Sequence, residues 1–420
     1  MSKYALLFPG QGSQYIGMAK KWYTGYSAAK RVFEEADDLL GYGLSQLCFE
    51  GNIGELTKTL YAQPAIFTSS IAAFHVYMEE IGVEPVCSAG HSLGEISALV
   101  CSGAVSFPAG LKLVQNRATF MQEAADATQG SMLAITDLPA KVVEETCAAI
   151  NPSVVVSNYN SHDQTVISGN EEDIKKIGEL FEQMGATVIP LKVGAPFHSP
   201  YMKPASIKFL RALEQIEYLK LKWPVISNVT GLPYEESKIA QYLSAQMLEP
   251  VRWQQSMAYI AGQDVEYAIE IGPKNVLTKL MTKNQPLVKA YSFDIENDYL
   301  DLKRVSAPSV SAFNTIGVII KCLAVAVSTK NNNWSNNEYE QGVIVPYKKI
   351  QLQLEELEKK GNQPSLDECI SALRLLKQIF DTKGTSIVEQ EERYIQIFEE
   401  TGTYELLHNA CSELGFFKRK

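Results

Sequence analysis

The sequence predicts an α/β fold: an α/β-hydrolase-like large subdomain with an inserted ferredoxin-like small subdomain, followed by an all-α C-terminal extension. Three observations support this. A strand, a sharp turn and a helix follow one another around Ser92; the βαββαβ order occurs over residues 131–193; and only helices are predicted beyond about residue 311. Because 420 residues are too many for one ordinary core, we expect several domains. Their expected bounds are 1–129 and 194–291 for the large subdomain, 130–193 for the small subdomain, and 292–420 for a linker and the helical extension.

The turn at the centre of this prediction is Gly90-His-Ser-Leu-Gly94, which follows an apolar run and precedes an Ala/Leu/Ile-rich segment. This is the G-x-S-x-G pattern, whose glycines are needed because Cβ atoms would clash in so sharp a bend. Ser92 would lie at the N-terminus of a helix, where partial positive charge and free N–H groups can stabilise an oxyanion. A plain turn between a strand and a helix remains the alternative, because so short a pattern also arises by chance.

The chain begins with a predicted buried strand at residues 4–8 and a Gly-rich turn at 9–14. A dinucleotide fingerprint would need a third glycine where Tyr15 stands, which disfavours a nucleotide site. The glycines can instead let the backbone approach a reacting centre and deliver the Gln11 amide to it; otherwise Gln11 lies in solvent in a tight turn. Helices are then predicted at residues 27–40 and 64–80, the second carrying His75, which we expect to be a packed core residue.

The small subdomain is predicted from four short apolar runs separated by helical segments. The expected strands are 131–135, 154–157, 165–168 and 186–191, and the expected helices are 139–150 and 171–184. A polar turn at residues 158–163 contains His162, which we expect to be exposed.

His198 is the best candidate for a general base. It stands between Pro196 and Pro200, which stiffen the backbone around it. The other four histidines are less suitable. One lies beside the serine on the wrong side of the turn (His91), one in an early helix (His75), one in a hairpin loop (His162) and one in the distant tail (His408). Arg117 lies on a predicted helix, and composition alone would leave it among the solvated arginines that helices usually carry.

The second half returns to alternating strands and helices before it becomes helical. The expected elements are helices 201–215, 241–246, 253–261 and 272–280, and strands 225–229, 267–271 and 286–291. A linker is expected at 292–311, and helices are expected at 316–328, 346–359, 366–380, 387–399 and 404–414, with a loop at 331–337. Ser365 and Ser386 each begin a capping box. Because no nucleophile, base or ligand set occurs in this extension, it is expected to be an interaction or packing module.

Composition excludes several other classes. The net charge of −10 argues against a general nucleic-acid binder, although it allows a local basic patch. The seven cysteines are scattered without a C-x-x-C pair, which favours reduced thiols in a cytoplasmic protein over disulfides or a metal site. The N-terminal apolar stretch is too short for a signal peptide, and the longest apolar run, 316–327, is too short to span a membrane. We therefore expect no nucleic-acid, membrane or metal partner.

Eight short motifs occur in order along residues 3–290. They are Phe8-Pro-Gly-Gln-Gly-Ser-Gln14, Gln63-Pro-Ala65, Gly90-His-Ser-Leu-Gly-Glu95, Arg117 with Met121-Gln122, Asn160-x-x-x-Gln164-Thr-Val-Ile-Ser-Gly169, Pro196-Phe-His198, Glu249-Pro-Val-Arg-Trp253 and Glu270-Ile-Gly-Pro273. Together they resemble the malonyl-CoA:acyl carrier protein transacylases and the acyltransferases of polyketide synthases. The extension from residue 292 lies outside the usual core of that family and resembles extensions on some free-standing acyltransferases of polyketide pathways.

The resemblance implies a role for each catalytic residue. Ser92 would be the nucleophile and His198 its base, while Gln11 and the backbone N–H of Leu93 would form the oxyanion hole. Arg117 would bind the malonyl carboxylate, because a planar guanidinium can donate two parallel hydrogen bonds to it. In place of the acidic residue of a catalytic triad, a backbone carbonyl near Leu248 or Glu249 would orient the imidazole.

Further residues are expected in substrate binding by the same resemblance: Gln63, His91, Asn160 and Phe197. Phe197 before the histidine resembles the members that select malonyl rather than branched methylmalonyl units.

The implied activity is that of an [acyl-carrier-protein] S-malonyltransferase. A malonyl group would pass from malonyl-CoA to the serine and then to the phosphopantetheine thiol of an acyl carrier protein, in fatty acid or trans-acting polyketide synthesis, with no permanently bound cofactor. Two alternatives are an acyl hydrolase that clears carrier proteins and a docking subunit that acts through the C-terminal helices. The sequence leaves open the pathway, the identity of the carrier, the oligomeric state and the role of residues 292–420.

Overall fold

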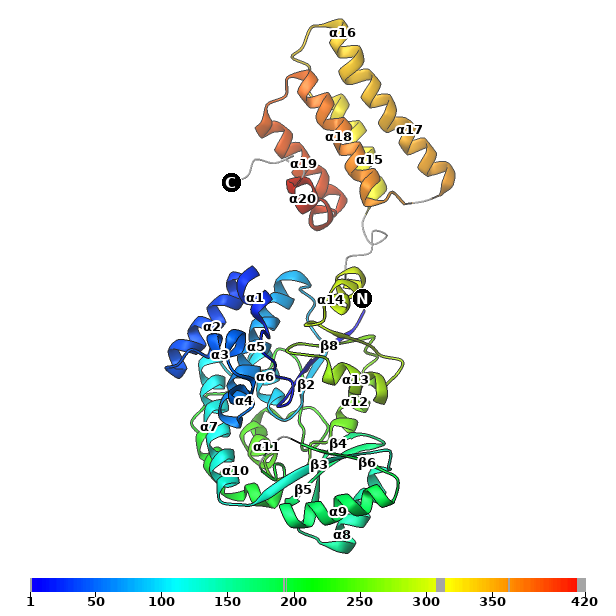
Figure 1. Cartoon of the computed structure of the whole chain (residues 1–420). Coiled ribbons are helices and arrows are strands. Elements are labelled where there is room, and N and C mark those ends of the chain that lie inside the picture. Colours follow the sequence, from blue (N-terminus) through cyan, green and yellow to red (C-terminus); the bar gives the residue numbers. More distant parts are fainter. Residues whose placement is uncertain (1, 192, 194, 307–313, 362, 414–420) are drawn as a thin grey trace. The chain divides into compact units, whose positions relative to one another are not determined.

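The computed structural model describes residues 2–191, 193, 195–306, 314–361 and 363–413. Its internal contacts divide the chain into two compact units, residues 1–306 and 307–420 (Figure 1). Each unit has its own hydrophobic core. The finer division of residues 1–291 into large and small subdomains stays a prediction.

A parallel sheet forms the centre of the first unit. Within the described residues its strand order is β7-β2-β1-β8-β9, and all neighbours are parallel. The bounds are Tyr4–Phe8 for β1, Cys87–Gly90 for β2, Val225–Ile226 for β7, Tyr267–Glu270 for β8 and Lys289–Ser292 for β9. Every residue of the central strand β1 is buried, as expected for a parallel strand covered on both faces.

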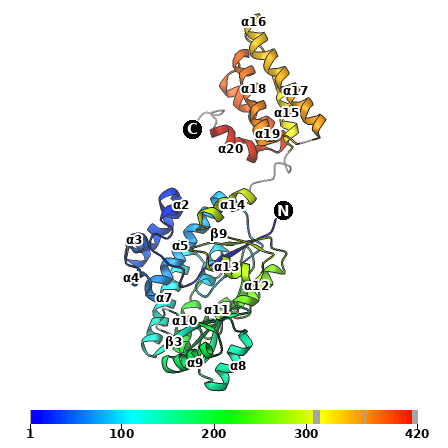
Figure 2. The same ribbon diagram turned by 45° about the vertical axis from the view of Figure 1, so that its right-hand side comes forward.

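Helices cover this sheet. They are α1 (Lys20–Gly25), α2 (Ser27–Leu40), α3 (Leu44–Glu50), α4 (Ile53–Leu56), α5 (Thr59–Glu80), α6 (Gly94–Cys101), α7 (Phe107–Asp126), α10 (Lys203–Leu213), α11 (Ile239–Ala245), α12 (Trp253–Ala261) and α13 (Val276–Asn284), with short 3-10 turns at η1 (Pro200–Met202) and η2 (Glu236–Lys238). Figures 1 and 2 show α2, α3, α4, α5 and α7 gathered on one side of the sheet.

Two expectations for helix α5 are wrong. The helix begins at Thr59 rather than Pro64, so the proline lies inside it and removes one backbone hydrogen bond. Burial of most of the helix offsets that loss. His75 lies on the exposed side of α5 and is not a packed core residue.

The small sheet confirms the ferredoxin-like expectation. Its order is β4-β5-β3-β6, all antiparallel, with β3 at Gly130–Thr136, β4 at Val155–Ser161, β5 at Gln164–Asn170 and β6 at Thr187–Pro190. Helices α8 (Ala140–Ile150) and α9 (Glu171–Gln183) lie on its outer side in both views (Figures 1 and 2). A cluster of apolar side chains from the strands and both helices forms the core between them.

Strand β4 is longer than predicted, and β7 is shorter. The polar stretch that begins at Asn158 continues β4 to Ser161 through two irregularities in register, which leaves only a tight turn with His162 exposed, as expected. Irregularities of this kind turn side chains away from the regular alternation and are common next to active sites. The predicted strand 225–229 ends at Ile226, and the backbone N–H of Asn228 donates to Glu95 Oε1 instead of to the neighbouring strand.

The linker expected at 292–311 is wrong for residues 296–306, which form helix α14 (Glu296–Ser306). Tyr299 and Leu302 are three residues apart and are both buried against the first unit. The Tyr299 ring packs edge-on against Trp22 and Phe293, with ring centroids 5.4 Å and 5.2 Å away. Burial of these side chains outweighs the polar composition that favoured a linker; residues 307–311 lie outside the described residues.

The second unit is all-α within the described residues, as predicted. Its elements are α15 (Thr315–Ser328), α16 (Asn336–Tyr339), a π-helical turn η4 (Glu340–Ile344), α17 (Val345–Lys360), α18 (Leu366–Lys383), α19 (Ile387–Thr401) and α20 (Tyr404–Glu413). The expected loop at 331–337 therefore ends two residues early. Ser365 forms the predicted capping box with Glu368, and the Ser386 side chain caps α19 by accepting a hydrogen bond from the Glu389 N–H. In the described part of the chain, no helix is long and apolar enough to cross a membrane.

The packing of α14 predicts a sharp difference between two leucines two residues apart. Leu302 is fully buried and Leu300 is 43% exposed. Leu302→Ala should lower the free energy of unfolding by about 2–4 kcal/mol, because it leaves a cavity, whereas Leu300→Ala should change it by about 0.5 kcal/mol or less. Urea unfolding of the two variants measures both; equal effects would show that α14 does not belong to the first unit's core.

Candidate active site

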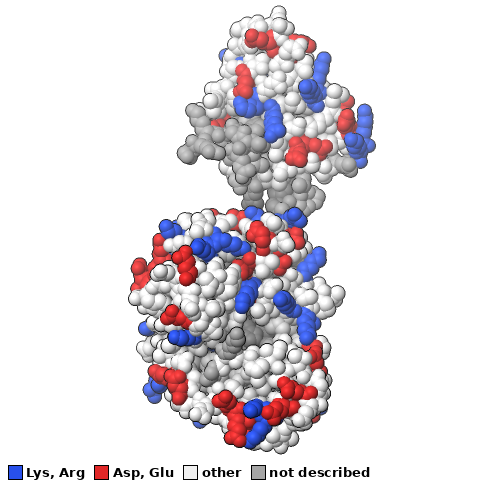
Figure 3. Space-filling model, in the orientation of Figure 1, with Lys and Arg blue, Asp and Glu red and all other residues white. Residues whose placement is uncertain are grey.

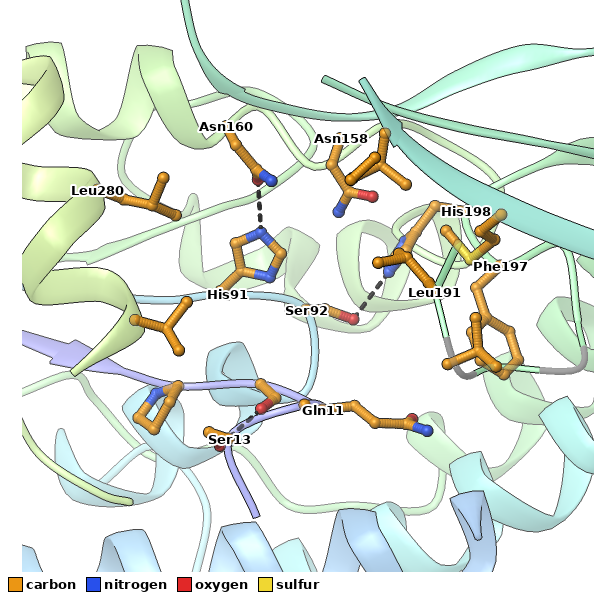
Figure 4. A pocket seen from close by; sticks show the side chains of 18 of the residues that line it. Gln11, Ser13, His91, Ser92, Asn158, Asn160, Leu191, Phe197, His198 and Leu280 are labelled. Carbon is orange, nitrogen blue, oxygen red and sulfur yellow. Dashed lines mark hydrogen bonds between the residues drawn. The ribbon is translucent and has the colours of Figure 1, made fainter. Parts of the chain in front are cut away.

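A cavity of about 380 Å³ lies where the C-terminal ends of β1 and β2 face the small sheet. Its walls come from the turn after β1, from the turn after β2, from α7 and α13, and from strands β3 to β6. Figure 4 shows Ser92 and His198 pointing toward each other inside it, with Asn158 and Asn160 on the side of the small sheet and Gln11 on the opposite side. Parallel α/β sheets commonly bind ligands at this end of their strands.

Ser92 occupies the sharp turn that the glycine pattern predicts. Its φ is 52°, in the left-handed region that non-glycine residues rarely adopt. A Cβ at Gly90 would lie 1.9 Å from the backbone of Gly94, and a Cβ at Gly94 would lie 2.0 Å from the carbonyl oxygen of Phe8. Both glycines are therefore required for the turn to close against β1.

His198 lies within hydrogen-bonding distance of the serine. Its Nε2 is 2.8 Å from Ser92 Oγ, and its Nδ1 is 2.7 Å from the backbone oxygen of Gln246. The orienting carbonyl, expected near Leu248 or Glu249, is that of Gln246, two residues before Leu248. Gln246 follows the last turn of α11, where helix carbonyls lack partners within the helix and are free to accept from the imidazole. Because the Gln246 carbonyl can only accept, the neutral imidazole carries its proton on Nδ1 and donates it to this carbonyl. Nε2 is then free to take the hydroxyl proton.

Burial keeps His198 neutral. The side chain is 4% exposed, and its loss of hydration, together with the nearby positive charge of Arg117, lowers the pKa of His198 to about 3. A neutral imidazole is the form that accepts a proton, so His198 is in the state that a general base requires.

Arg117 projects from α7 into the same cavity and is only 2% exposed. Its Nη1 donates to Gln63 Oε1 at 2.7 Å, and its Nη2 donates to both Ser92 Oγ and Gln246 Oε1 at 3.0 Å. Burial lowers the pKa of Arg117 to about 10, which still leaves the group charged at neutral pH. No carboxylate forms an ion pair with Arg117 among the described residues, so a buried positive charge faces the cavity beside the serine.

Two backbone N–H groups close to Ser92 in the turns that line the cavity have no assigned acceptor among the described residues. They belong to Gln11 and to Leu93, the residue before the first turn of α6. The side-chain amide of Gln11 donates instead to Thr59 Oγ1 at 3.4 Å. The backbone of Gln11, rather than its side chain, is therefore the group available to a developing oxyanion.

The other expected residues divide between the cavity wall and the layer behind it. His91, Asn160 and Phe197 line the cavity, and His91 Nε2 is 3.0 Å from Asn160 Oδ1. Gln63 is fully buried, does not line the cavity, and holds Arg117 from behind. The imidazole of His91 contacts Asn160 rather than the serine, which agrees with its exclusion as the base.

Sequence reasoning missed three polar residues that support the site, namely Gln246, Asn228 and Glu95. Asn228 Oδ1 accepts from the Ser92 N–H at 2.7 Å, and its Nδ2 donates to the Gly90 carbonyl at 2.7 Å. Glu95 is fully buried and accepts hydrogen bonds from the Asn228 N–H and from Gln246 Nε2. Burial raises the pKa of Glu95 to about 7. Glu95 lies within the serine motif, but nothing in the sequence indicates that this acidic side chain is buried.

The described residues contain no group of three histidine, cysteine or acidic side chains placed to hold a metal ion. Over the face shown in Figure 3, basic and acidic side chains are interspersed rather than gathered by sign. The expectation that no nucleic acid binds stays a prediction that this distribution supports.

Comparison with known proteins gives consistent matches. Residues 5–291 match the family described as the acyl transferase domain. A malonyl CoA-acyl carrier protein transacylase of Bacillus subtilis is 38% identical over 398 residues, covering 93% of this chain and 99% of that protein. Another of the same name from Bacillus subtilis strain 168 is 43% identical over 288 residues, covering 67% of this chain and 90% of that protein. The 398-residue match is longer than the first unit, so it extends into the C-terminal helices.

A solved structure gives a similar result. A malonyl-transacylase in complex with a type II PKS acyl-carrier protein is 36% identical, with a TM-score of 0.70, covering 72% of this chain and 100% of that one.

The low pKa of His198 predicts how the reactivity of Ser92 depends on pH. The neutral imidazole persists down to its pKa, so labelling of Ser92 by a serine-directed phosphonate should change little between pH 7 and pH 5. An ordinary histidine would halve the rate near pH 6.5. The labelling rate followed by intact mass measures this, with His198→Ala as the unreactive control. A midpoint near 6.5 would contradict the account.

Proposed function

This chain belongs to the acyl transferase family, and from that premise we propose that it is a malonyl-CoA:acyl carrier protein transacylase that carries the malonyl group on Ser92. One observation supports the acidic acyl group above all. A buried guanidinium without a carboxylate partner among the described residues lies 3.0 Å from the serine hydroxyl.

In the first half-reaction, Ser92 Oγ attacks the thioester carbonyl of malonyl-CoA. His198 Nε2 accepts the hydroxyl proton as the C–O bond forms, and the N–H groups of Gln11 and Leu93 stabilise the oxyanion. When the C–S bond breaks, the imidazolium returns the proton to the departing thiolate. The Gln246 carbonyl keeps the ring aligned throughout.

In the second half-reaction, the phosphopantetheine thiol of the acyl carrier protein attacks the malonyl-serine ester. His198 now accepts the thiol proton and returns it to Ser92 Oγ as the ester bond breaks, which regenerates the free enzyme. Neither step changes an oxidation state. We therefore propose that malonyl-CoA and the carrier are substrates and that no cofactor is permanently bound.

Arg117 selects malonyl through its charge. A malonyl carboxylate can accept two hydrogen bonds from the guanidinium, whereas an acetyl group leaves those donors with only the amide oxygens of Gln63 and Gln246. Hydrogen bonds to charged groups contribute about 1.5–3 kcal/mol each, which corresponds to roughly tenfold or more in preference. Phe197 adds an apolar wall to the same cavity.

The alternative of an acyl hydrolase for neutral acyl groups is less well supported. Such an enzyme would have no use for a buried cation beside its nucleophile, and burying one is costly. We further propose a cytoplasmic location, because all seven cysteines are free thiols, as expected in a reducing compartment.

For the second unit, we propose an interaction or packing module. It has a separate core, and one full-length relative matches into it. A chain ending at Ser306 should still transfer malonyl to a generic carrier and lose only partner-specific transfer. Loss of all transfer in a folded truncated protein would contradict this proposal.

The proposed role of Arg117 predicts a change of substrate preference rather than a general loss. Arg117→Ala should lose malonyl transfer and keep or gain acetyl transfer, because the partner of the carboxylate is gone and the nucleophile and base remain. Mass spectrometry of the protein after incubation with each acyl-CoA gives the malonyl-to-acetyl ratio at residue 92. Ser92→Ala, which should take up neither group, is the control. An unchanged ratio in Arg117→Ala would rule out the carboxylate clamp.

A further inference from the structure

A single amide side chain separates the buried guanidinium of Arg117 from the buried carboxyl group of Glu95. Arg117 and Glu95 are 2% and 0% exposed, and the side chain of Gln246 hydrogen-bonds to both. We propose that Glu95 is a positioning residue for the malonyl clamp, and that it acts on Arg117 through the side-chain amide of Gln246. The inference rests on the proposed function, since that function gives Arg117 its task.

The orientation of the Gln246 amide follows from the charges at its two ends. Its Nε2 donates to Glu95 Oε2, and its Oε1 accepts from Arg117 Nη2 at 3.0 Å. Reversing the amide would place its NH₂ group against the guanidinium and its oxygen against the carboxylate, so both contacts would be lost. The Glu95 carboxylate therefore reinforces the amide orientation that presents the Gln246 oxygen to Arg117.

The indirect arrangement keeps the arginine available to substrate. A carboxylate in direct contact with Arg117 would occupy the parallel donors that a malonyl group needs. Placed one amide away, Glu95 still opposes the loss of charge that burial favours, because its negative charge raises the pKa of Arg117. The Arg117 donors on the cavity side stay free of any carboxylate among the described residues.

The same amide also bonds the nucleophile turn. Gln246 Nε2 donates to the Ser92 carbonyl at 2.9 Å, and the Gln246 backbone oxygen accepts from His198. The second oxygen of Glu95 accepts from the Asn228 N–H at 3.1 Å and from the Tyr234 hydroxyl. Asn228 Oδ1 also lies 3.4 Å from Gln246 Nε2, so Asn228 belongs to the same group of contacts. The Tyr234 hydroxyl contacts Glu95 from outside this group.

The test compares malonyl and acetyl transfer in the full-length protein. Glu95→Gln keeps the size of the side chain but replaces the charge-assisted bond to Gln246. At pH 8, above the Glu95 pKa of about 7, the KM for malonyl-CoA should therefore rise by roughly tenfold, the effect of weakening one hydrogen bond to a charged group. Acetyl transfer should change much less. A purely electrostatic effect would act in the opposite direction, because removing an anion should favour an acidic substrate.

A double-mutant cycle identifies the route. In an Arg117→Ala background, Glu95→Gln should no longer alter the malonyl-to-acetyl ratio, because the residue on which it acts is absent. Tyr234→Phe removes a hydrogen bond that favours the charged form of the same carboxylate, so it should shift the ratio in the same direction as Glu95→Gln but by less. If Glu95→Gln fails to fold, Gln246→Met replaces it, because it removes the amide that joins Glu95 to Arg117. Gln246→Met should shift the malonyl-to-acetyl ratio in the same way, and it should leave that ratio unchanged in the Arg117→Ala background.

Three outcomes would overturn the proposal: an equal fall in malonyl and acetyl transfer, a malonyl KM that stays or falls, or a shift in ratio that persists without Arg117. Each differs from failure of the proposed function, which would appear as a wild-type protein that does not take up malonyl on Ser92.

Discussion

The structure of the site depends on burying one guanidinium beside one hydroxyl. Arg117 is almost fully removed from water and donates to Ser92 Oγ at 3.0 Å. A buried charge is costly unless polar groups surround it, which explains the amide oxygens of Gln63 and Gln246 at hydrogen-bonding distance. These amides hold the cation without neutralising it, so its charge remains for an acidic acyl group. Glu95, buried behind the Gln246 amide, adds a negative charge near this buried cation.

The proposed nucleophile and the proposed base both have a strained backbone. Ser92 and His198 have φ values of 52° and 54°, although neither is a glycine. Such conformations cost on the order of 1–3 kcal/mol each and persist only where the surroundings enforce them. At the serine, Asn228 Oδ1 accepts a hydrogen bond from the backbone N–H of the strained residue, and at the histidine the Gln246 carbonyl orients the ring. Strain at both positions places hydroxyl and imidazole 2.8 Å apart before substrate arrives.

Much of this could be predicted from the sequence where the signal is local. The glycines around Ser92 and the prolines around His198 predict a turn and a stiff loop, and the alternation over 131–193 predicts the small sheet that the structure confirms. What could not be predicted depends on distant packing. Gln246 and Asn228 lie far from the serine in sequence, and no spacing indicates that they meet it. Helix α14 forms because two of its side chains bury, against a composition that favours a linker.

A crystal structure of the protein malonylated on Ser92 would test the central claim most directly. The account predicts that both terminal nitrogens of Arg117 lie within hydrogen-bonding distance of the malonyl carboxylate, with Nη2 moved from Ser92 Oγ and the Gln246 amide still between Arg117 and Glu95. A malonyl carboxylate directed into solvent, or bound by another residue while Arg117 keeps its present contacts, would contradict it.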